Sequence, residues 1–108
     1  MVPFDIYRII LPWAGCNDPR PWLIIDVRPN EVFGCFPIAS QCYQGRCYKI
    51  DSSHEDFRGT GLTKTCHVHH GLVVEVSAKT LRAGKRLGRL EGSLRGHFCF
   101  ACGLDIAG

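Results

Sequence analysis

The chain has 108 residues, of which 45% are hydrophobic and 21% charged, and its formal net charge is +3. This composition excludes a disordered chain, and the length suits one hydrophobic core, so we expect a single domain over residues 1–108. No run reaches the roughly 18 apolar residues of a membrane span, so we expect no membrane partner. The seven cysteines cannot all pair within one chain. With no secretory signal at the start, we expect reduced thiols and a cytoplasmic location.

Glycine and proline are frequent, and they favour short strands joined by tight turns over a helical bundle. The residues from 14 to 21 are predicted to be a loop, because glycine, asparagine, aspartate and two prolines interrupt a strand ladder. Apolar and β-branched runs predict strands, in chain order, over residues 4–11, 22–27, 31–38, 46–50, 63–68, 72–76 and 86–90.

One helix is predicted, over residues 93–103. Ser93 is the expected N-cap, and Gly103 is the expected residue just after the C-terminus. The residues that recur at helical spacing and would form one buried face are Leu94, Phe98, Ala101 and Cys102. Several short strands followed by one terminal helix indicate a mainly β fold, a small barrel or sandwich with the helix packed against it.

A basic segment runs from Lys79 to Arg95 and contains a single acid, Glu91. Such a segment beside a folded core can contact phosphate. A run of charges is more often an ordinary solvated face, so both interpretations stay open at this point.

Cysteine and histidine spacing raises the question of a metal site. Cys99 and Cys102, with His97 nearby, are spaced like zinc ligands, and Cys42 and Cys47 would supply the other half of the site. Because Cys102 falls on the apolar helix face, we favour buried or free thiols, and we expect no metal and no cofactor.

Three histidines gather in the stretch CHVHHG, at positions 67, 69 and 70. Histidine suits acid–base chemistry near neutral pH, and in a strand His67 and His69 would share one face. We interpret the cluster as the end of a hairpin, with acid–base work as the alternative.

Three stretches, taken in order, resemble the PemK/MazF-like endoribonuclease toxins. The first is DIYRIILPW, followed after a short loop by RPWLIID, which starts at Arg20. The second is FPIASQ at residues 36–41, similar to the family segment in which a strand ends in Thr or Ser before the catalytic cleft. The third runs from GLTK at residue 61 through LGRL at residue 87 to CGL at residue 102. Together they cover most of the chain.

The resemblance implies a small SH3-like barrel that forms a homodimer, cleaves single-stranded RNA without a metal ion and is blocked by an antitoxin. Arg20 matches the family's catalytic arginine, and Ser40 matches its hydroxyl position. In such cleavage the 2′-hydroxyl of the RNA attacks the phosphate, and an arginine stabilises the phosphate with its planar fork. The ordinary alternatives are a surface ion pair between Arg20 and Asp18, and a turn role for Ser40.

Four further residues are expected to contact RNA: Trp13, Gln41, Lys64 and Lys79. Trp13 borders the loop before Arg20 and would stack on unpaired bases. The Arg and Asp that the family often carries on a later strand have no match in LVVEVSAKTL, where Glu75 and Lys79 stand. The alternative to an enzyme is therefore a catalytically degenerate SH3-like barrel that binds RNA or protein.

Overall fold

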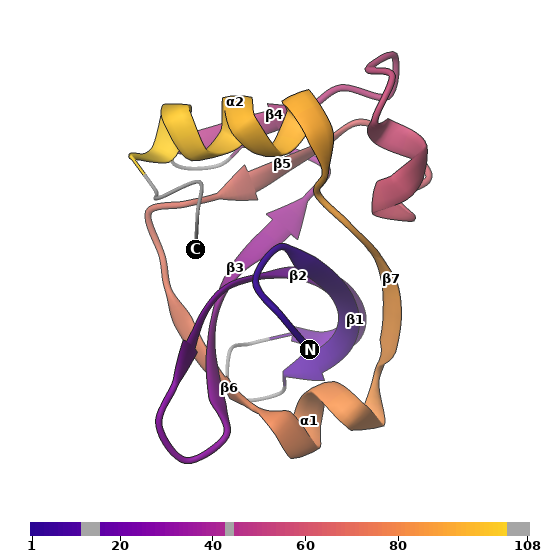
Figure 1. Cartoon of the computed structure of the whole chain (residues 1–108). Helices are drawn as coiled ribbons and strands as arrows, with labels where there is room; N and C mark the ends of the chain where they lie inside the picture. Colours follow the sequence, from indigo (N-terminus) through magenta and orange to yellow (C-terminus); the bar gives the residue numbers. More distant parts are fainter. Residues whose placement is uncertain (12–15, 43–44, 104–108) are drawn as a thin grey trace.

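The computed structural model describes residues 1–11, 16–42 and 45–103 (Figure 1). Its elements, in chain order, are β1 (Asp5–Leu11), β2 (Cys16–Arg28), β3 (Val32–Ala39), β4 (Cys47–Ile50), the 3-10 helix η2 (Phe57–Thr60), β5 (Cys66–His69), β6 (Val74–Ser77), α1 (Ala78–Ala83), β7 (Lys85–Arg89) and α2 (Gly92–Cys102). The prediction of a mainly β chain with a C-terminal helix is confirmed.

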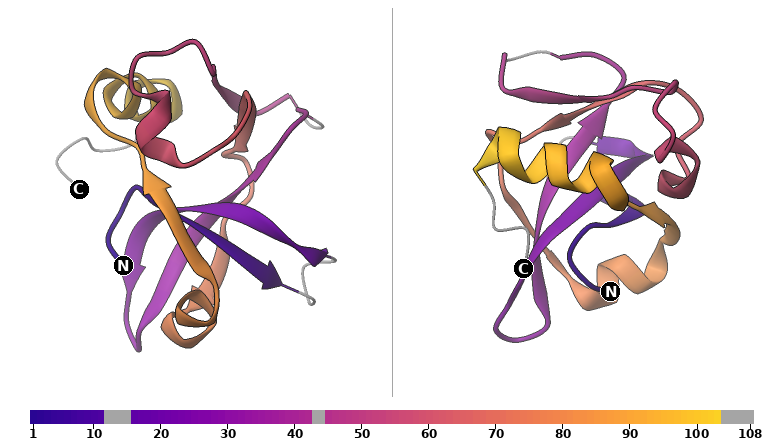
Figure 2. Two further views of the ribbon diagram at one scale, coloured as in Figure 1. Left: turned by 90° about the vertical axis from the view of Figure 1, so that its right-hand side faces the viewer. Right: turned by 45° about the horizontal axis from the view of Figure 1, so that its top comes forward.

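Strand β3 joins the two halves of the sheet. The strands follow the order β4-β5-β3-β2-β1-β7, with β6 paired to β3, and all pairings between described strands are antiparallel. Residues 32–35 of β3 pair with β6, whereas Ile38 and Ala39 pair with β5. The sheet therefore changes partners along β3 and curls around its core instead of lying flat (Figure 2).

Each α-helix covers one of two apolar clusters. Leu94, Phe98 and Cys99 of α2 pack into a cluster with residues of β1 to β5. Ala78 and Leu81 of α1 pack into a second cluster beneath β1, β2, β3 and β6. In the described part of the chain, no helix combines the length and the apolar character needed to cross a membrane.

Strand β2 starts earlier than the sequence predicts. Residues 16–21, expected to be a loop, continue the strand and pair with β1. The ladder between β2 and β3 ends at the pair Trp22 and Pro37, so Pro19 and Pro21 lie where β2 has no second partner. Proline is tolerated on such an edge because no ladder hydrogen bond is lost.

Two details of the helices also differ from expectation. Helix α1 was not predicted; its N-cap is Ser77, whose Oγ accepts a hydrogen bond from Thr80 N at 3.2 Å. Helix α2 begins at Gly92 with Glu91 as N-cap, so Ser93 is not the cap. Ser93 Oγ instead donates to Asp56 Oδ2 at 3.2 Å.

The C-terminal end of α2 matches the prediction only in part. Gly103 ends the helix in the left-handed conformation, as expected. Ala101, predicted to be buried, is exposed, whereas Cys99 is fully buried. The face that packs on the core therefore consists of Leu94, Phe98 and Cys99, with Cys102 partly buried against the same cluster as predicted, whereas Ala101 faces solvent.

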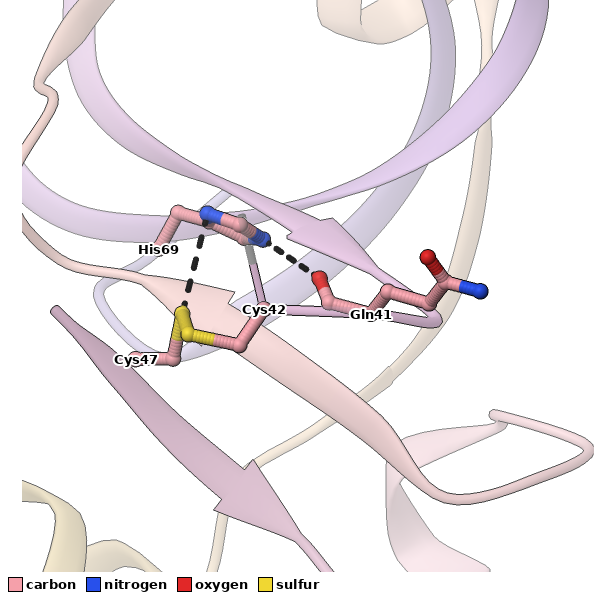
Figure 3. Close-up of a disulfide and its surroundings, with 4 residues drawn as sticks. All are labelled: Gln41, Cys42, Cys47 and His69. Atoms are coloured by element: carbon pink, nitrogen blue, oxygen red, sulfur yellow. Dashed lines mark hydrogen bonds between the residues drawn. A yellow bond between two sulfur atoms is a disulfide. The ribbon is translucent and has the colours of Figure 1, made fainter. Parts of the chain in front are cut away.

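The prediction of reduced thiols is wrong for one pair. Cys42 and Cys47 form a disulfide with a Cα–Cα distance of 5.9 Å (Figure 3). The two residues are only five positions apart in sequence, with Cys42 shortly after β3 and Cys47 at the start of β4, and their separation lies within the range of a disulfide. The other cysteines whose side chains are described, Cys35, Cys66, Cys99 and Cys102, form no disulfide among the described residues.

Candidate functional site

A cleft of about 350 Å³ opens where β2 and β3 separate. One wall is formed by residues 19–21 of β2 and the other by residues 38–40 at the end of β3. The segment 61–64, which precedes β5, closes one end, and Arg8, Cys66 and Leu87 complete the lining.

Two prolines explain why the cleft is at this position. Pro21 and Pro37 lack the N–H group that a continued ladder between β2 and β3 requires. Beyond Pro37, β3 pairs with β5 through Ile38 and Ala39, while β2 continues beside β1 alone. The strands therefore diverge, and the residues just past the point of divergence face the space between them.

The structure brings three of the predicted site residues into this cleft. Arg20 lies on the β2 wall, Ser40 follows the end of β3, and Lys64 lies on the segment before β5. All three side chains are exposed. Positions 20, 40 and 64 are far apart in sequence, and the antiparallel pairing of β1, β2, β3 and β5 places them around one opening.

The other predicted RNA contacts lie elsewhere. Gln41 is exposed, and its backbone carbonyl accepts a hydrogen bond from His69 Nε2 at 2.9 Å. Lys79 lines a neighbouring groove of about 770 Å³ together with Lys85, Ile10 and other residues. Trp13 lies outside the described residues. The cleft and the groove share Arg8 and Pro19, so Lys79 is adjacent to the cleft but not part of it.

Two polar residues of the cleft were not predicted. Arg8 is an exposed residue of β1 that pairs with Pro21, directly beside Arg20. Thr63 lies next to Lys64 in the GLTK stretch and adds a second hydroxyl. In the sequence, Arg8 and Thr63 are visible only as polar positions within DIYRIIL and GLTK. Their place in the cleft follows from the fold, which pairs Arg8 with Pro21 and brings the segment before β5 to the same opening.

The cleft is cationic, and the described residues that line it include no acidic side chain. Its described lining carries Arg8, Arg20 and Lys64, the hydroxyls of Ser40 and Thr63, and no carboxylate or imidazole. Within residues 1–11, 16–42 and 45–103, none of these three cations forms an ion pair, so the alternative of a bridge from Arg20 to Asp18 is not observed. Unpaired cations around an open cleft suit a phosphate ligand.

The cysteine at the base of the cleft is not suited to act as a nucleophile. The Cys66 thiol donates a hydrogen bond to the Lys64 carbonyl oxygen at 3.3 Å. Burial raises the pKa of the Cys66 thiol, against a smaller lowering by Lys64, so the neutral form is favoured. This residue therefore packs the floor of the cleft.

The hypothesis of a zinc site built from four cysteines is wrong for two of its ligands. Cys42 and Cys47 are bonded to each other and cannot bind a metal as thiolates. Among the described residues, no group of three or more histidine, cysteine, aspartate or glutamate side chains is placed to hold a metal ion.

No protein-family model matches the chain, and no curated protein matches it. Solved structures do match. One, described as an endoribonuclease in complex with its cognate antitoxin from Mycobacterial species, is 16% identical, with 94% of this chain and 90% of that chain covered and a TM-score of 0.67. The Mycobacterium tuberculosis toxin MazF-mt6 is 22% identical, with 94% and 98% covered and a TM-score of 0.65. At these identities the similarity concerns the fold, and the chain has the fold of the MazF toxins.

Proposed function

We propose that this chain is a toxin-type endoribonuclease that cleaves single-stranded RNA in the cytoplasm without a metal ion. The observation that carries the proposal is the cleft between β2 and β3, where the cations Arg8, Arg20 and Lys64 have no described carboxylate partner. The shared fold supports the reaction class, because one of the matching structures is described as an endoribonuclease and the other as a toxin.

Arg20 is assigned the stabilisation of the phosphate. Attack by the 2′-hydroxyl on the adjacent phosphorus adds negative charge to the phosphate oxygens, and the reaction yields a 2′,3′-cyclic phosphate and a free 5′-hydroxyl. The planar guanidinium group of Arg20 can donate hydrogen bonds to two of these oxygens at once, and Lys64 adds a second positive charge. The Ser40 hydroxyl at the end of β3 and the Thr63 hydroxyl beside Lys64 can donate to the same phosphate and fix its orientation.

An antitoxin and a second copy of this chain are the proposed protein partners. The first matching structure is described as a complex with a cognate antitoxin. An extended acidic segment would pair with the same cations that are assigned to RNA, so it would block the cleft by direct competition. The homodimer follows from the resemblance, and sedimentation at several protein concentrations tests it.

A binding module is the second candidate function. The observation that favours it is the absence of any carboxylate or imidazole among the described residues that line the cleft. Proton transfer to and from the reacting oxygens needs such groups or a substitute, whereas phosphate binding needs only the cations. In this alternative the chain holds RNA and leaves it intact.

The test is incubation of the purified chain with a long single-stranded RNA in excess EDTA. We expect discrete fragments with 2′,3′-cyclic phosphate ends, and we expect no cleavage when the nucleotide 5′ to the cut carries a 2′-deoxy sugar. RNA that is bound but uncut would support the binding module. RNA that is neither bound nor cut would contradict both functions.

A further inference from the structure

Arg8 and Lys85 place two positive charges directly opposite each other on neighbouring strands. Arg8 of β1 is the cross-strand partner of Lys85, the first residue of β7, and both residues are exposed. Direct partners have Cβ atoms about 5 Å apart, and like charges at that spacing destabilise a sheet. Within the part of the chain that the structure describes, neither residue forms an ion pair. The pair therefore carries a repulsion that an anion from outside the chain would relieve.

Other cations of the same basic segment are satisfied within the fold. Arg86, the residue after Lys85, has its Nη2 atom 3.4 Å from Asp5 Oδ1. Arg82 of α1 has its Nη2 atom 3.9 Å from Glu31 Oε2. Lys85 lies between these two paired arginines in sequence, and its charge stays available for a ligand.

The opposed pair lies in the groove of about 770 Å³ that adjoins the cleft. Lys79 adds a third positive charge, and the described residues that line the groove include no acidic side chain. Ile10, which is 46% exposed, and Pro19 contribute apolar surface. The groove therefore combines cations that suit a phosphate with apolar surface that suits a base or a sugar.

Gly84 explains why Lys85 lies beside Arg8. It separates α1 from β7, and a Cβ at position 84 would overlap the Arg8 carbonyl oxygen and the Ile9 side chain. Because glycine has no Cβ, the end of α1 can contact β1 directly, and β7 begins as the neighbour of β1 (Figure 1).

We propose that the groove is a second phosphate subsite, in which Arg8, Lys79 and Lys85 bind the RNA backbone next to the linkage that is cut in the cleft. The inference rests on the proposed RNA function and extends it from one bound phosphate to two. The cleft and the groove share Arg8 and Pro19, so a strand that leaves the cleft past Arg8 enters the groove directly.

RNA fits this surface better than an extended peptide does. Pro19 and Pro21 lie where β2 has no partner other than β1, and neither has an N–H group. A peptide could therefore not add a regular strand to this edge. Phosphate binding needs only charged donors, and the three cations of the groove supply them.

The experiment is a binding scan with a single-stranded 2′-O-methyl RNA in which one linkage at a time is a neutral methylphosphonate. Its sequence is the tightest binder from a random pool, so the scan does not depend on cleavage. In wild type, neutralising either of two linkages is expected to weaken binding about threefold to fivefold. One linkage should lose its effect in Arg20→Ala and the other in Lys85→Gln, which assigns one phosphate to each opening.

Arg82→Gln is the matched control, because it removes one charge from the same segment at a residue already paired with Glu31. It is expected to bind RNA within about twofold of wild type, as is Lys85→Arg, which keeps the charge. Without RNA, Lys85→Gln should melt at or above the wild-type temperature, because it removes the repulsion from Arg8. A lower melting temperature would instead assign Lys85 to the fold and overturn the proposal.

The binding scan has further outcomes that would overturn the second subsite. One is wild-type RNA affinity in Lys85→Gln, and another is coupling of Lys85 and Arg20 to the same linkage. A loss of poly-glutamate binding in Lys85→Gln with RNA binding unchanged would make the groove a protein-docking surface. Two coupled linkages in a chain that cuts no RNA would contradict the proposed enzyme and support the subsite, whereas a wild-type chain that binds no RNA would contradict both.

Discussion

Strand β2 carries an arginine near each end, and the two arginines have opposite surroundings. Arg28 Nε donates to Asp26 Oδ1 at 3.1 Å, and its Nη1 lies 3.6 Å from Glu75 Oε2. Arg20 meets no carboxylate among the described residues and lines the cleft. A paired arginine is satisfied within the fold, whereas an unpaired one at an opening keeps its donors for a ligand. The comparison separates charges that hold β2 in place from charges that are available for RNA.

The residues around Arg28 and those around Arg20 differ in a way that explains the two environments. At the paired end, Gly34 N also donates to Asp26 Oδ1 at 3.1 Å, and a Cβ at position 34 would overlap that carboxylate oxygen. The hydrogen bond from Arg28 to Asp26 is the main reason that the pKa of Arg28 is raised. At the cleft end, Pro21 and Pro37 stop the ladder and leave Arg20 at a strand edge.

The largest effect is expected from Arg20→Ala. Removal of one donor to a developing phosphate charge typically lowers the rate by about 10²–10³-fold, and we expect a loss of that size in RNA cleavage. Arg20→Lys should restore only part of the lost cleavage rate, because lysine keeps the positive charge but cannot donate two parallel hydrogen bonds. Initial cleavage rates and thermal melting measure the two effects, and the melting temperature should not change.

The matched control is Arg28→Ala on the same strand. It removes the same charge from the chain but from a position already paired with Asp26 and Glu75. Cleavage is expected to stay at the wild-type rate. Equal losses in Arg20→Ala and Arg28→Ala would show that net charge, and not the cleft, sets the rate.

Gly34→Ala should act on stability and leave the cleft intact. The added Cβ meets Asp26 Oδ1, the end of a half-exposed side chain that can move aside. The expected cost is the loss of the hydrogen bond from Gly34 N and a weaker contact with Arg28, about 0.5–1.5 kcal/mol of unfolding free energy. Urea denaturation measures the change. Cleavage well below the melting temperature is expected to match wild type. A loss of cleavage without a loss of stability would show that the Arg28 end of β2 also takes part in the reaction.

Lys64→Ala and Lys79→Ala distinguish the cleft from the adjacent groove. Lys64 lines the cleft, so its removal is expected to lower cleavage about tenfold, which corresponds to about 1.4 kcal/mol. Lys79 lines the groove that shares Arg8 with the cleft, so its removal should cost only about threefold. The ratio of the two rates is the measurement, and a larger effect at Lys79 would move the reacting phosphate to the groove.

A modest effect is also expected from Ser40→Ala. One neutral hydrogen bond contributes about 0.5–1.5 kcal/mol, so cleavage should fall roughly twofold to tenfold. Ser40→Thr keeps the hydroxyl and should stay close to wild type. If both variants behave alike, the hydroxyl contacts no phosphate and Ser40 serves the turn after β3.

The sequence predicts the strands and the terminal helix well where the signal is local. Residues 16–21 were expected to be a loop because proline interrupts a strand that pairs with neighbours on both sides. Here β2 pairs with β1 alone, so its prolines are tolerated on the open edge. Helix α1 has six residues, too few to show a period, and only its Ser77 cap marked it. The disulfide joins two cysteines only five positions apart, so their spacing was a local signal, but the same spacing also suits half of a zinc site.

The site was predictable only in part for the same reason. The resemblance indicates Arg20, Ser40 and Lys64 one by one, whereas their proximity depends on strand pairing across the sheet. In the sequence, Arg8 is an ordinary polar position within β1. Its place beside the cleft follows from its pairing with Pro21. Lys79 was assigned from the linear basic run, which does not show that the groove and the cleft are separate.

The most direct test of the central claim measures binding without chemistry. A single-stranded RNA with 2′-O-methyl sugars cannot be cut, and its Kd is measured against salt concentration for wild type, Arg20→Ala and Arg28→Ala. Loss of one phosphate contact should reduce the slope of log K on log salt by about 0.7 for a single strand. We predict that reduction for Arg20→Ala and an unchanged slope for Arg28→Ala. An unchanged slope for Arg20→Ala, or the same reduction in both variants, would contradict the assignment of the unpaired cleft cations to RNA.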